Sequence, residues 1–336
     1  MREFIEKILN KENLTALEME RVMHEVMSGT ATKDDLAAFL MALREKGPTV
    51  EEITGAARIM RKFVIPITTK HEVVLDTCGT GGDKTGTFNI STLTALVLAA
   101  AGVAVAKHGN RSVSSRCGSA DILEGLGVNL NMSTGRLGEC LDTIGIAFLF
   151  AQKLHPAMKH AACVRKELGV ETIFNVLGPL TNPAMATHQM MGVYSRDLVE
   201  PMAKVLKNLG LKRAMVVHGN DGLDEATTTG DTFVSEYKGD GIQSYTISPA
   251  EVGIPLAKPE DLRGGDVETN VGIAEDILGG QKGPKRDIVV LNAACALYTA
   301  EVCPTISDGV VLACKTIDSG KARQKLEQLK EFSNRA

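Results

Sequence analysis

Two polar segments, each placed directly after a short apolar run, constrain this chain more than any other feature. The first spans residues 76–83 (DTCGTGGD) and follows the apolar residues 73–75; we call it the glycine loop. The second spans residues 107–115 (KHGNRSVSS) and follows the apolar residues 103–106; we call it the basic loop. Glycines let a backbone approach an anion closely, and the free N–H groups that open a helix attract negative charge. The two loops predict a crevice for a ligand with several phosphate groups, at the carboxyl ends of neighbouring strands.

The familiar nucleotide-binding motifs do not fit the glycine loop. Gly79 and Gly81 begin like the dinucleotide fingerprint, but Lys84 stands where a third glycine is needed. Asp83 separates Gly82 from that lysine, so the Gly-Lys-Ser/Thr ending of an ATP-type phosphate loop is absent. A carboxylate here would repel a bare phosphate but could contact a sugar hydroxyl or metal-bound water. A turn with no ligand remains the alternative for either loop alone.

Size and composition indicate an ordinary globular protein of one or two domains. The chain has 336 residues, 44% of them hydrophobic, and a net charge of −4, so it offers no global attraction for nucleic acid. The N-terminus lacks the apolar core of a signal peptide, and the alanine-rich stretch 92–106 is too short to span a membrane. Seven cysteines form no Cys-x-x-Cys pair, which predicts reduced thiols, a cytoplasmic location and no zinc site.

The first 68 residues predict a helical domain. Thr15, Thr32 and Thr49 each have a carboxylate residue three positions later, and each opens an apolar-periodic stretch. This is the pattern of a capping box, which satisfies the first N–H groups of a helix. Residues 155–169 also have a helical pattern, and no strand follows the Gly/Pro-rich loop 175–183. We therefore expect the chain to return to the helical domain over about 155–186.

From residue 72 onward, short strands alternate with amphipathic helices. That alternation predicts an α/β fold, with a mainly parallel sheet flanked by helices, over residues 69–154 and 187–336. The predicted strands are 73–76, 103–106, 147–150, 188–193 and 214–218, with 232–237 and 242–247 as a late pair. The predicted C-terminal helices are about 271–280, 287–302, 307–318 and 320–332.

Adjacent carboxylates follow the predicted strand 214–218. Asp224 and Glu225, which we call the acidic pair, repel one another, and a divalent cation would relieve that repulsion. Magnesium suits such a site because it is held by a few carboxylates together with substrate phosphates. A solvated loop is the alternative. Residues 89–92 (NIST) open the helix after the glycine loop and supply further hydroxyl groups for phosphate or magnesium.

Positive charge concentrates where the anion is expected. Lys107, His108 and Arg111 lie in the basic loop among amide and hydroxyl side chains, and Arg165 lies on the predicted 155–169 helix. An arginine there suits a carboxylate, since its guanidinium binds both oxygens. No Ser-His-Asp or Cys-His constellation is apparent. The site is therefore predicted to work by positioning and charge stabilisation, with no dedicated catalytic residue.

Taken together, these motifs resemble the anthranilate phosphoribosyltransferase family. The resemblance rests on residues 79–83, 87–92, 107–111, 119–124 and the acidic pair, and it runs through essentially the whole chain, including residues 175–183. It implies transfer of a phosphoribosyl group from 5-phosphoribosyl 1-pyrophosphate (PRPP) to the amine of anthranilate, in tryptophan biosynthesis. It also implies a homodimer formed through the helical domain, and it leaves open an association with an amidotransferase subunit.

The resemblance also implies residue roles. Two magnesium ions per subunit are expected, one on Ser91 and Glu225 and one on the acidic pair. Anthranilate is expected to contact Gly79, His108, Asn110 and Arg165. The residues expected around PRPP are Gly79, Gly82, Asp83, Thr87, Asn89, Ile90, Ser91, Thr92, Lys107, His108, Gly109, Asn110, Arg111, Ser112, Val113, Ser114, Ser115 and Ser119.

Two other functions are alternatives. A pyrimidine nucleoside phosphorylase-like enzyme shares the fold and a Lys-x-x-x-Arg loop, but its reaction needs neither pyrophosphate nor magnesium, so the acidic pair and the glycine loop disfavour it. A non-catalytic nucleic-acid-binding relative would need a basic stripe, which a chain of net charge −4 does not suggest. We expect small-molecule substrates, with neither nucleic acid nor membrane as a partner.

Overall fold

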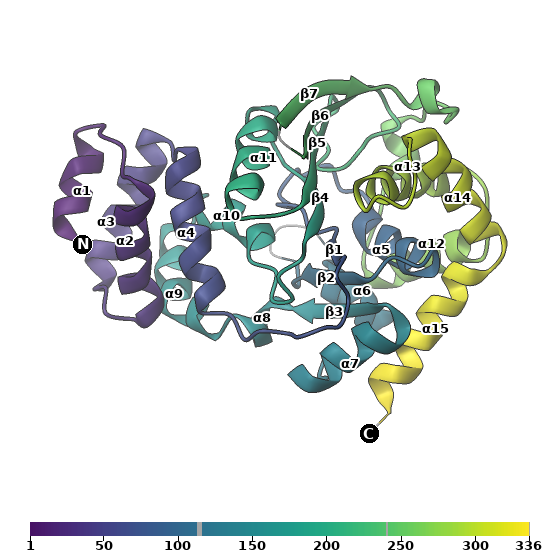
Figure 1. Cartoon of the computed structure of the whole chain (residues 1–336), viewed down its shortest axis with the longest axis horizontal. Helices are drawn as coiled ribbons and strands as arrows, with labels where there is room; N and C mark the ends of the chain where they lie inside the picture. The colour runs from purple at the N-terminus through teal and green to yellow at the C-terminus, as the bar shows by residue number, and fades with distance from the viewer. Residues whose placement is uncertain (113–115, 240, 336) are drawn as a thin grey trace.

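The protein is described by a computed structural model that covers residues 1–112, 116–239 and 241–335. Its N-terminal helices form a bundle beside a larger body built on a seven-stranded sheet (Figure 1). The bundle contains α1 (Arg2–Leu9), α2 (Ala16–Ser28), α3 (Lys33–Lys46) and α4 (Val50–Lys62). Of the helices described, none is long and apolar enough to cross a bilayer.

The predicted caps explain where the bundle helices begin. The side chains of Thr15 and Thr49 each accept a hydrogen bond from the amide of the N3 residue. The side chain of the N3 glutamate in turn accepts one from the amide of the capping threonine. Thr32 also caps its helix, although only the bond from the Asp35 amide forms. Helical structure ends at Lys62, earlier than the predicted residue 68, and a strand-free link then leads to the sheet.

The predicted return to the bundle takes a more broken form than one helix. The segment contains α8 (Ala151–Leu154), a 3-10 turn at Pro156–Met158, α9 (Lys159–Leu168) and α10 (Phe174–Leu177). The 155–169 prediction is therefore wrong in its first turn, because Pro156 follows a non-helical His155. α9 packs against α2 and α3, and α10 packs against α4.

All seven predicted strands are present, and the sheet is mainly parallel. Its order is β3-β2-β1-β4-β5-β6-β7, with β1 to β5 parallel and β6 and β7 antiparallel. The strands are β1 (Leu75–Asp76), β2 (Val105–Gly109), β3 (Ile146–Phe150), β4 (His188–Gly192), β5 (Arg213–Gly219), β6 (Thr232–Lys238) and β7 (Gly241–Ile247).

Two strands, β1 and β2, differ from the prediction by more than one residue at an end, and the other five differ by one residue at one or both ends. β1 is two residues long, because exposed Val73 lies outside the ladder and the Val74 amide donates to the Thr187 side chain instead. β2 continues to Gly109, because residues 105–109 pair in parallel with β3. The basic loop therefore begins inside the sheet, which fixes Lys107 and His108 firmly.

Two hydrophobic cores cover the two faces of the sheet. Along β5, Met215 and Val217 join one core, and Ala214 and Val216 join the other, as the two-residue period of a strand requires. The second core continues through α11 (Val199–Asn208) into the bundle. The first core is covered by α5 (Ile90–Ala100), α6 (Ser119–Gly125), α7 (Thr134–Ile144), α12 (Val267–Leu278), α13 (Pro284–Thr299), α14 (Ile306–Asp318) and α15 (Lys321–Asn334).

Candidate active site

The glycine loop follows β1, the basic loop starts in β2 and the acidic pair follows β5. All three therefore lie at the carboxyl edge of the parallel sheet. The Gly81 amide donates to Asp224 Oδ2 at 2.7 Å, which joins the glycine loop to the acidic pair. The Thr80 amide donates to the Gly192 carbonyl at 2.9 Å, which anchors the loop to the end of β4. These contacts bring the predicted segments together at one edge of the sheet.

Glycines in the loop serve different physical purposes. A Cβ atom at Gly79 would lie 2.8 Å from the Gly192 carbonyl oxygen, so close packing excludes a side chain there. Gly81 and Gly82 have φ of 65° and 85°, in the left-handed region that glycine tolerates best, and open space surrounds their missing side chains. Asp83 accepts hydrogen bonds from the amide and hydroxyl of Thr85 within the same loop.

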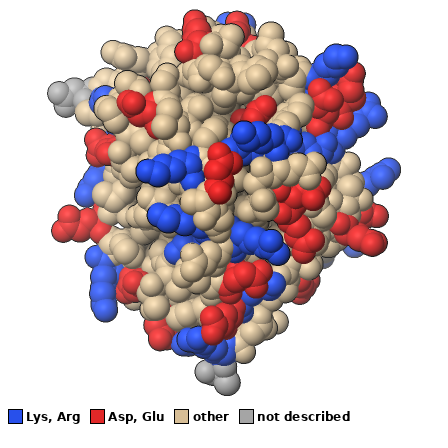
Figure 2. Space-filling model, turned by 90° about the vertical axis from the view of Figure 1, so that its right-hand side faces the viewer, with Lys and Arg blue, Asp and Glu red and all other residues tan. Residues whose placement is uncertain are grey.

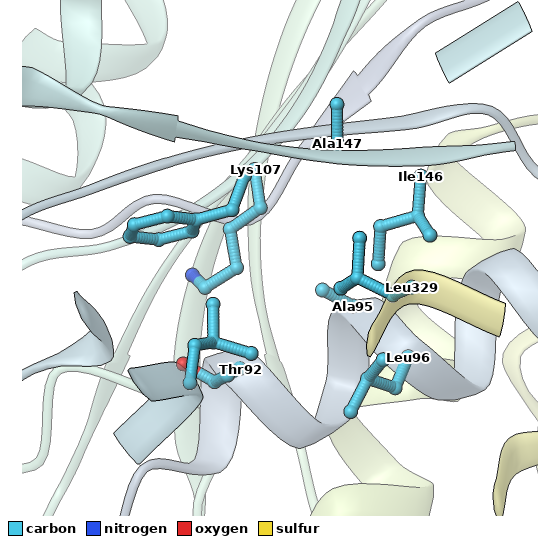
Figure 3. Close-up of a pocket in the computed structure, with 9 residues that line it drawn as sticks. Thr92, Ala95, Leu96, Lys107, Ile146, Ala147 and Leu329 are labelled. Carbon is cyan, nitrogen blue, oxygen red and sulfur yellow. The ribbon is translucent and has the colours of Figure 1, made fainter. Parts of the chain in front are cut away.

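Lys107 is almost completely buried behind the glycine loop. Its ammonium lies 3.3 Å from Ser91 Oγ and 3.4 Å from Thr77 Oγ1, which joins β2 to the first turn of α5. Figure 3 shows its side chain directed toward that turn, where Thr92 lies. The small cavity beside it has room for about one water molecule, with a volume of ≈ 10 Å³. This cavity is too small for substrate, and it lies between β2, β3 and the helices α5, α6 and α15.

The acidic pair carries more negative charge than its surroundings compensate. Burial, and then the charge of Asp83, raise the pKa of Asp224 to about 7. Burial, and then Asp224, raise the pKa of Glu225 well above its ordinary value; Lys107 and the Ser91 amide lower it but do not offset the rise. A divalent cation would relieve this repulsion, and carboxylate and hydroxyl oxygens are the ligands magnesium prefers. The residues present therefore fit magnesium.

A second cluster of possible metal ligands does not fit a metal. One ligand atom each from Asp76, Cys78 and His108 lie within 4.8 Å of one another. The Asp76 carboxylate already accepts from the amides of Cys78 and His108, both at 3.1 Å, and from the Asn182 side chain at 2.7 Å. Burial raises the pKa of the Cys78 thiol, so it stays protonated. The cluster holds the loops together instead.

His108 is held neutral. Its Nε2 lies 3.0 Å from Nε2 of His155, which belongs to the segment that returns to the bundle. Burial, and then the neighbouring His155, lower the pKa of His108 to about 3, and burial lowers that of His155 to about 4. Two neutral imidazoles can share one hydrogen bond, and the two ring centroids lie 4.9 Å apart with the rings tilted by 40°. Neither is basic enough to remove a proton efficiently near neutral pH.

The described part of the basic loop is fastened to α6. Asp121 accepts from the amides of Ser112 and Gly118, at 3.1 and 2.9 Å. The guanidinium of Arg111 is already paired with two carboxylates, because it donates to Asp121 and Glu124, both at 2.8 Å. Asn110 is exposed, and its carbonyl accepts from the Ser119 hydroxyl at 3.2 Å. The predicted contacts Val113, Ser114 and Ser115 lie outside the described residues.

The other predicted PRPP residues lie around the start of α5. Thr87 forms an isolated antiparallel bridge with Arg263. The Asn89 amide group donates to the Cys117 carbonyl at 3.0 Å, and its oxygen accepts from Asn270 at 3.1 Å. Asn89 therefore joins the start of α5 to the residues just before α6 and to α12. Ile90 and Thr92 are buried in the first turn of α5, and Gly109 ends β2 against Ser119 and Phe148.

Arg165 lies on α9, on the side of the molecule that belongs to the bundle. Its guanidinium stacks over the Phe174 ring at 5.2 Å, and burial lowers its pKa from the ordinary value. No carboxylate pairs with it in the ranges that the structure describes. A half-buried cation without a protein anion is suited to an anionic ligand.

Sequence reasoning missed several residues that shape this site. Asn182 donates to Asp76 at 2.7 Å and to the Ala106 carbonyl at 2.8 Å, which fastens the returning segment to β1 and β2. Gly192 lets the Asp224 main chain cross directly over β4, since a Cβ atom there would overlap the Asp224 carbonyl. A polar residue inside an apolar or Gly/Pro-rich stretch was the available signal for Asn182; Gly192 had none.

Comparison with known proteins agrees with this arrangement. Residues 2–64 match the helical bundle domain of a glycosyl transferase family, and residues 71–323 match its a/b domain. The anthranilate phosphoribosyltransferase of Acetivibrio thermocellus is 52% identical over 99% of this chain and 97% of its own length. The crystal structure of the Thermus thermophilus enzyme superposes with a TM-score of 0.94, at 45% identity, over 98% of this chain and 99% of that one.

A more distant structure bears on ligands. Anthranilate phosphoribosyltransferase from Saccharomyces cerevisiae, in complex with PRPP and Mg, superposes with a TM-score of 0.90. It is 26% identical and covers 98% of this chain, which in turn covers 97% of it. The bundle and the carboxyl edge of the sheet are therefore shared across a wide range of sequences.

Proposed function

The chain belongs to the anthranilate phosphoribosyltransferase family, and we propose that its catalytic crevice is formed by the glycine loop, the basic loop and the acidic pair. It transfers the phosphoribosyl group of PRPP to the amine of anthranilate and releases pyrophosphate, in tryptophan biosynthesis. The observation that carries the proposal for the site is the undercompensated charge of the acidic pair, next to the Gly81 amide.

PRPP binds along the carboxyl edge of the sheet in this proposal. The amides of the glycine loop and of the first turn of α5 face the phosphates, together with the hydroxyls of residues 87–92. The basic loop (residues 107–115) and Ser119 complete the proposed PRPP site. Asp83 contacts the ribose hydroxyls or metal-bound water. The yeast relative was solved in complex with PRPP, which supports PRPP as the ligand.

Two magnesium ions per subunit are proposed, one on Ser91 and Glu225 and one on the acidic pair. The support is chemical: these oxygens suit magnesium, and the yeast relative's structure contains Mg together with PRPP. When bound, magnesium supplies positive charge that stabilises the departing pyrophosphate. Asp224 and Glu225 contribute carboxylate oxygens fixed on their loop, which a bound cation would keep ionised although burial and mutual repulsion raise the pKa of both groups.

Anthranilate binds between the sheet edge and α9. Arg165 holds its carboxylate by two hydrogen bonds, His108 and Gly79 lie against the ring, and Asn110 contacts its polar groups. The support is the unpaired state of Arg165 among the described residues and the neutral state of His108. Breakage of the C1–oxygen bond leaves positive charge on the ribose, and the neutral aromatic amine can attack once placed. No strong general base is needed.

Assembly and domain organisation are further proposals. The unit of residues 1–68 with 155–186 forms the helical domain, and residues 69–154 and 187–336 form the α/β domain. A homodimer forms through the helical domain, where a mainly apolar groove of α1 and α3 is lined by Ile5, Leu9, Ala38, Met41 and Ala42, together with the charged residues Arg44 and Glu45. Leu9 and Met41 are 59% and 38% exposed, which favours burial against a second copy. We propose a cytoplasmic enzyme, consistent with seven free thiols.

The two rival functions lack comparable support. The relatives reported above are anthranilate phosphoribosyltransferases over nearly the whole chain, and nucleoside phosphorolysis would leave the acidic pair without a purpose. A nucleic-acid-binding role needs a continuous basic stripe. On the face shown in Figure 2, lysine and arginine are interspersed with aspartate and glutamate.

One experiment tests the proposed site together with the activity. Anthranilate fluorescence should fall after PRPP and magnesium are added to the purified protein, and should not fall when either is omitted. Thymidine and uridine with phosphate serve as the comparison. Phosphorolysis of these nucleosides, with stable anthranilate fluorescence, would favour the nucleoside phosphorylase and refute the proposal.

A further inference from the structure

We propose that Asn292, in the middle of α13, is a positioning residue that fixes the main chain of the acidic pair for magnesium. This inference rests on the proposed magnesium site. Asn292 is fully buried and lies outside the crevice, so it cannot contact substrate itself. Its influence passes through the backbone of Ala226, the residue directly after Glu225.

Both polar atoms of the Asn292 side chain bind that backbone. Oδ1 accepts from the Ala226 amide at 2.9 Å, and Nδ2 donates to the Ala226 carbonyl at 2.8 Å. Nδ2 also donates to the Ile288 carbonyl at 2.8 Å, one turn earlier in α13. The last bond holds the amide in one orientation, so the side chain presents its acceptor to the N–H and its donor to the C=O of the same residue.

The opposite side of the acidic pair is held by the sheet. The Asp224 main chain crosses Gly192 at the end of β4, so closely that a side chain there would collide with it. The Asp224 carboxylate accepts from the Gly81 amide. The acidic pair is therefore held on both sides. β4 and the glycine loop hold Asp224, and Asn292 holds Ala226, the residue that follows Glu225. Without the second anchor, the Glu225–Ala226 peptide could rotate and turn the Glu225 carboxylate away from Ser91.

Nothing in the packing of α13 explains an asparagine at this position. The helix segment 288–297 is otherwise apolar (IVVLNAACAL), and every residue in it is buried. Asparagine is a poor residue for a helix interior, and a buried amide needs hydrogen-bond partners. The two bonds to Ala226 supply the reason. Groups that orient metal ligands typically change metal affinity or activity about 10–100-fold when they are removed.

The test uses Asn292→Leu, which keeps the same branching and number of side-chain heavy atoms, and Asn292→Ala as a second variant in case the larger leucine does not fold. Thr299→Val is the matched control, because Thr299 is buried in the same helix and its hydroxyl, among the described residues, donates to the Cys295 carbonyl of α13 itself and not to the acidic pair. Thermal unfolding is followed during a magnesium titration at fixed PRPP, which reports binding without turnover. Activity and the KM for anthranilate are measured in parallel.

We expect the Asn292 variants to need about 10–100-fold more magnesium for half-maximal stabilisation and for half-maximal activity. The KM for anthranilate should change less than twofold, and the Thr299→Val titration should overlay the wild type. A lowered unfolding temperature with an unchanged magnesium midpoint would mean that Asn292 is only structural, and would overturn the inference.

The double variant Asp224→Asn, Glu225→Gln separates the inference from the proposal beneath it. If this variant shifts the magnesium midpoint and the Asn292 variants do not, only the positioning role fails. If the double variant also leaves the midpoint unchanged, the proposed magnesium site itself is wrong.

Discussion

Two buried or half-buried glutamates, one in the bundle and one at the sheet edge, show what separates a structural carboxylate from a functional one. Glu52 of α4 is fully buried and fully satisfied. It accepts from the Leu14 amide at 2.9 Å, from the Thr49 amide at 2.7 Å and from the Lys46 ammonium at 2.9 Å. The bundle therefore supplies every donor that this carboxylate needs.

Glu225 faces the opposite situation. Its nearest strong influence is another carboxylate, Asp224, and its pKa is well above the ordinary value, although Lys107 lowers it. A fold has no structural reason to bury two adjacent acids together, because doing so costs stability. A site that receives a cation has such a reason. Charge that the protein leaves unbalanced therefore marks the place where a ligand completes the balance.

The largest expected effect comes from removing that unbalanced charge. Asp224→Asn with Glu225→Gln is nearly isosteric and should lower turnover at low magnesium by at least about 100-fold. The unfolding temperature in the absence of ligands should stay the same or rise, because the repulsion is gone. Steady-state kinetics across a magnesium titration, with calorimetry of the ligand-free protein, measure both quantities.

Glu52→Gln provides the contrasting variant in the bundle. It removes a paired charge, so the free energy of unfolding should fall by about 2 kcal/mol, while the magnesium dependence stays unchanged. The comparison of the two glutamates breaks down if Glu52→Gln shifts the magnesium curve, or if the double variant at the sheet edge responds to magnesium as the wild type does.

Two arginines extend the comparison to positive charge. Arg213 is buried and bonded to Glu236 at 2.8 and 3.1 Å, whereas Arg165 has no carboxylate partner among the described residues. Truncating one member of a buried charge pair costs roughly 2–5 kcal/mol. Arg165→Ala should therefore lower anthranilate affinity tenfold or more, at about 1.4 kcal/mol per decade, with little change for PRPP.

Lysine substitutions sharpen this test because they preserve the charge. Arg165→Lys should still weaken anthranilate binding, since lysine lacks the two-pronged geometry. Arg213→Lys should lower the unfolding temperature and leave anthranilate binding unchanged. Binding can be followed by the quenching of anthranilate fluorescence or by calorimetry. Unaltered anthranilate saturation in Arg165→Ala would place the acceptor elsewhere.

A pair of glycines tests backbone approach separately from backbone strain. Gly82 and Gly253 have φ of 85° and 75°, and open space surrounds the missing Cβ of each. Alanine at either position should cost roughly 1 kcal/mol of stability, through the left-handed conformation. Only Gly82→Ala should also weaken PRPP binding, by several-fold more than anthranilate binding, because its methyl group would meet the diphosphate.

The two variants should therefore match in unfolding temperature and differ in the KM for PRPP. Equal losses for PRPP and anthranilate in Gly82→Ala would contradict the placement of the diphosphate. A loss of PRPP affinity in Gly253→Ala would mean that backbone strain at a distant position is enough to weaken PRPP binding.

The sequence predicted the elements of the fold well because their signals are local. The capping threonines marked the bundle helices, and every predicted strand lies in the sheet. The boundary at Lys107 was missed, because polar residues at a strand end look like a loop until the pairing with β3 is known. The early end of the bundle at Lys62 likewise depends on contacts with distant residues.

The candidate site was predicted from the sequence only where the chemistry is visible within a single motif. The acidic pair and the glycine loop were identified from adjacent carboxylates and spaced glycines. Asn182, Gly192 and Asn292 act on them from 30 or more positions away in the sequence, and one chain alone does not reveal such pairings. The engagement of Arg111 by Asp121 and Glu124 was also invisible, since those carboxylates read as ordinary residues of a helix.

The smallest expected effect concerns the neutral pair of His108 and His155, which joins the sheet edge to the returning segment. Burial lowers their pKa values to about 3 and about 4, whereas both titrate near 6.5 in the unfolded chain. Between pH 6.5 and 4 the unfolded chain therefore binds more protons than the folded protein, so stability falls as the pH falls. Each group contributes at most about 1.4 kcal/mol per pH unit.

His155→Asn should flatten the dependence of the unfolding temperature on pH below 6.5 and change little above pH 7. His160→Asn, at an exposed position of α9, should leave it unaltered. Parallel curves for wild type and His155→Asn would show that the pair is not held neutral by the fold, and would remove His108 from the groups kept uncharged for the aromatic ring.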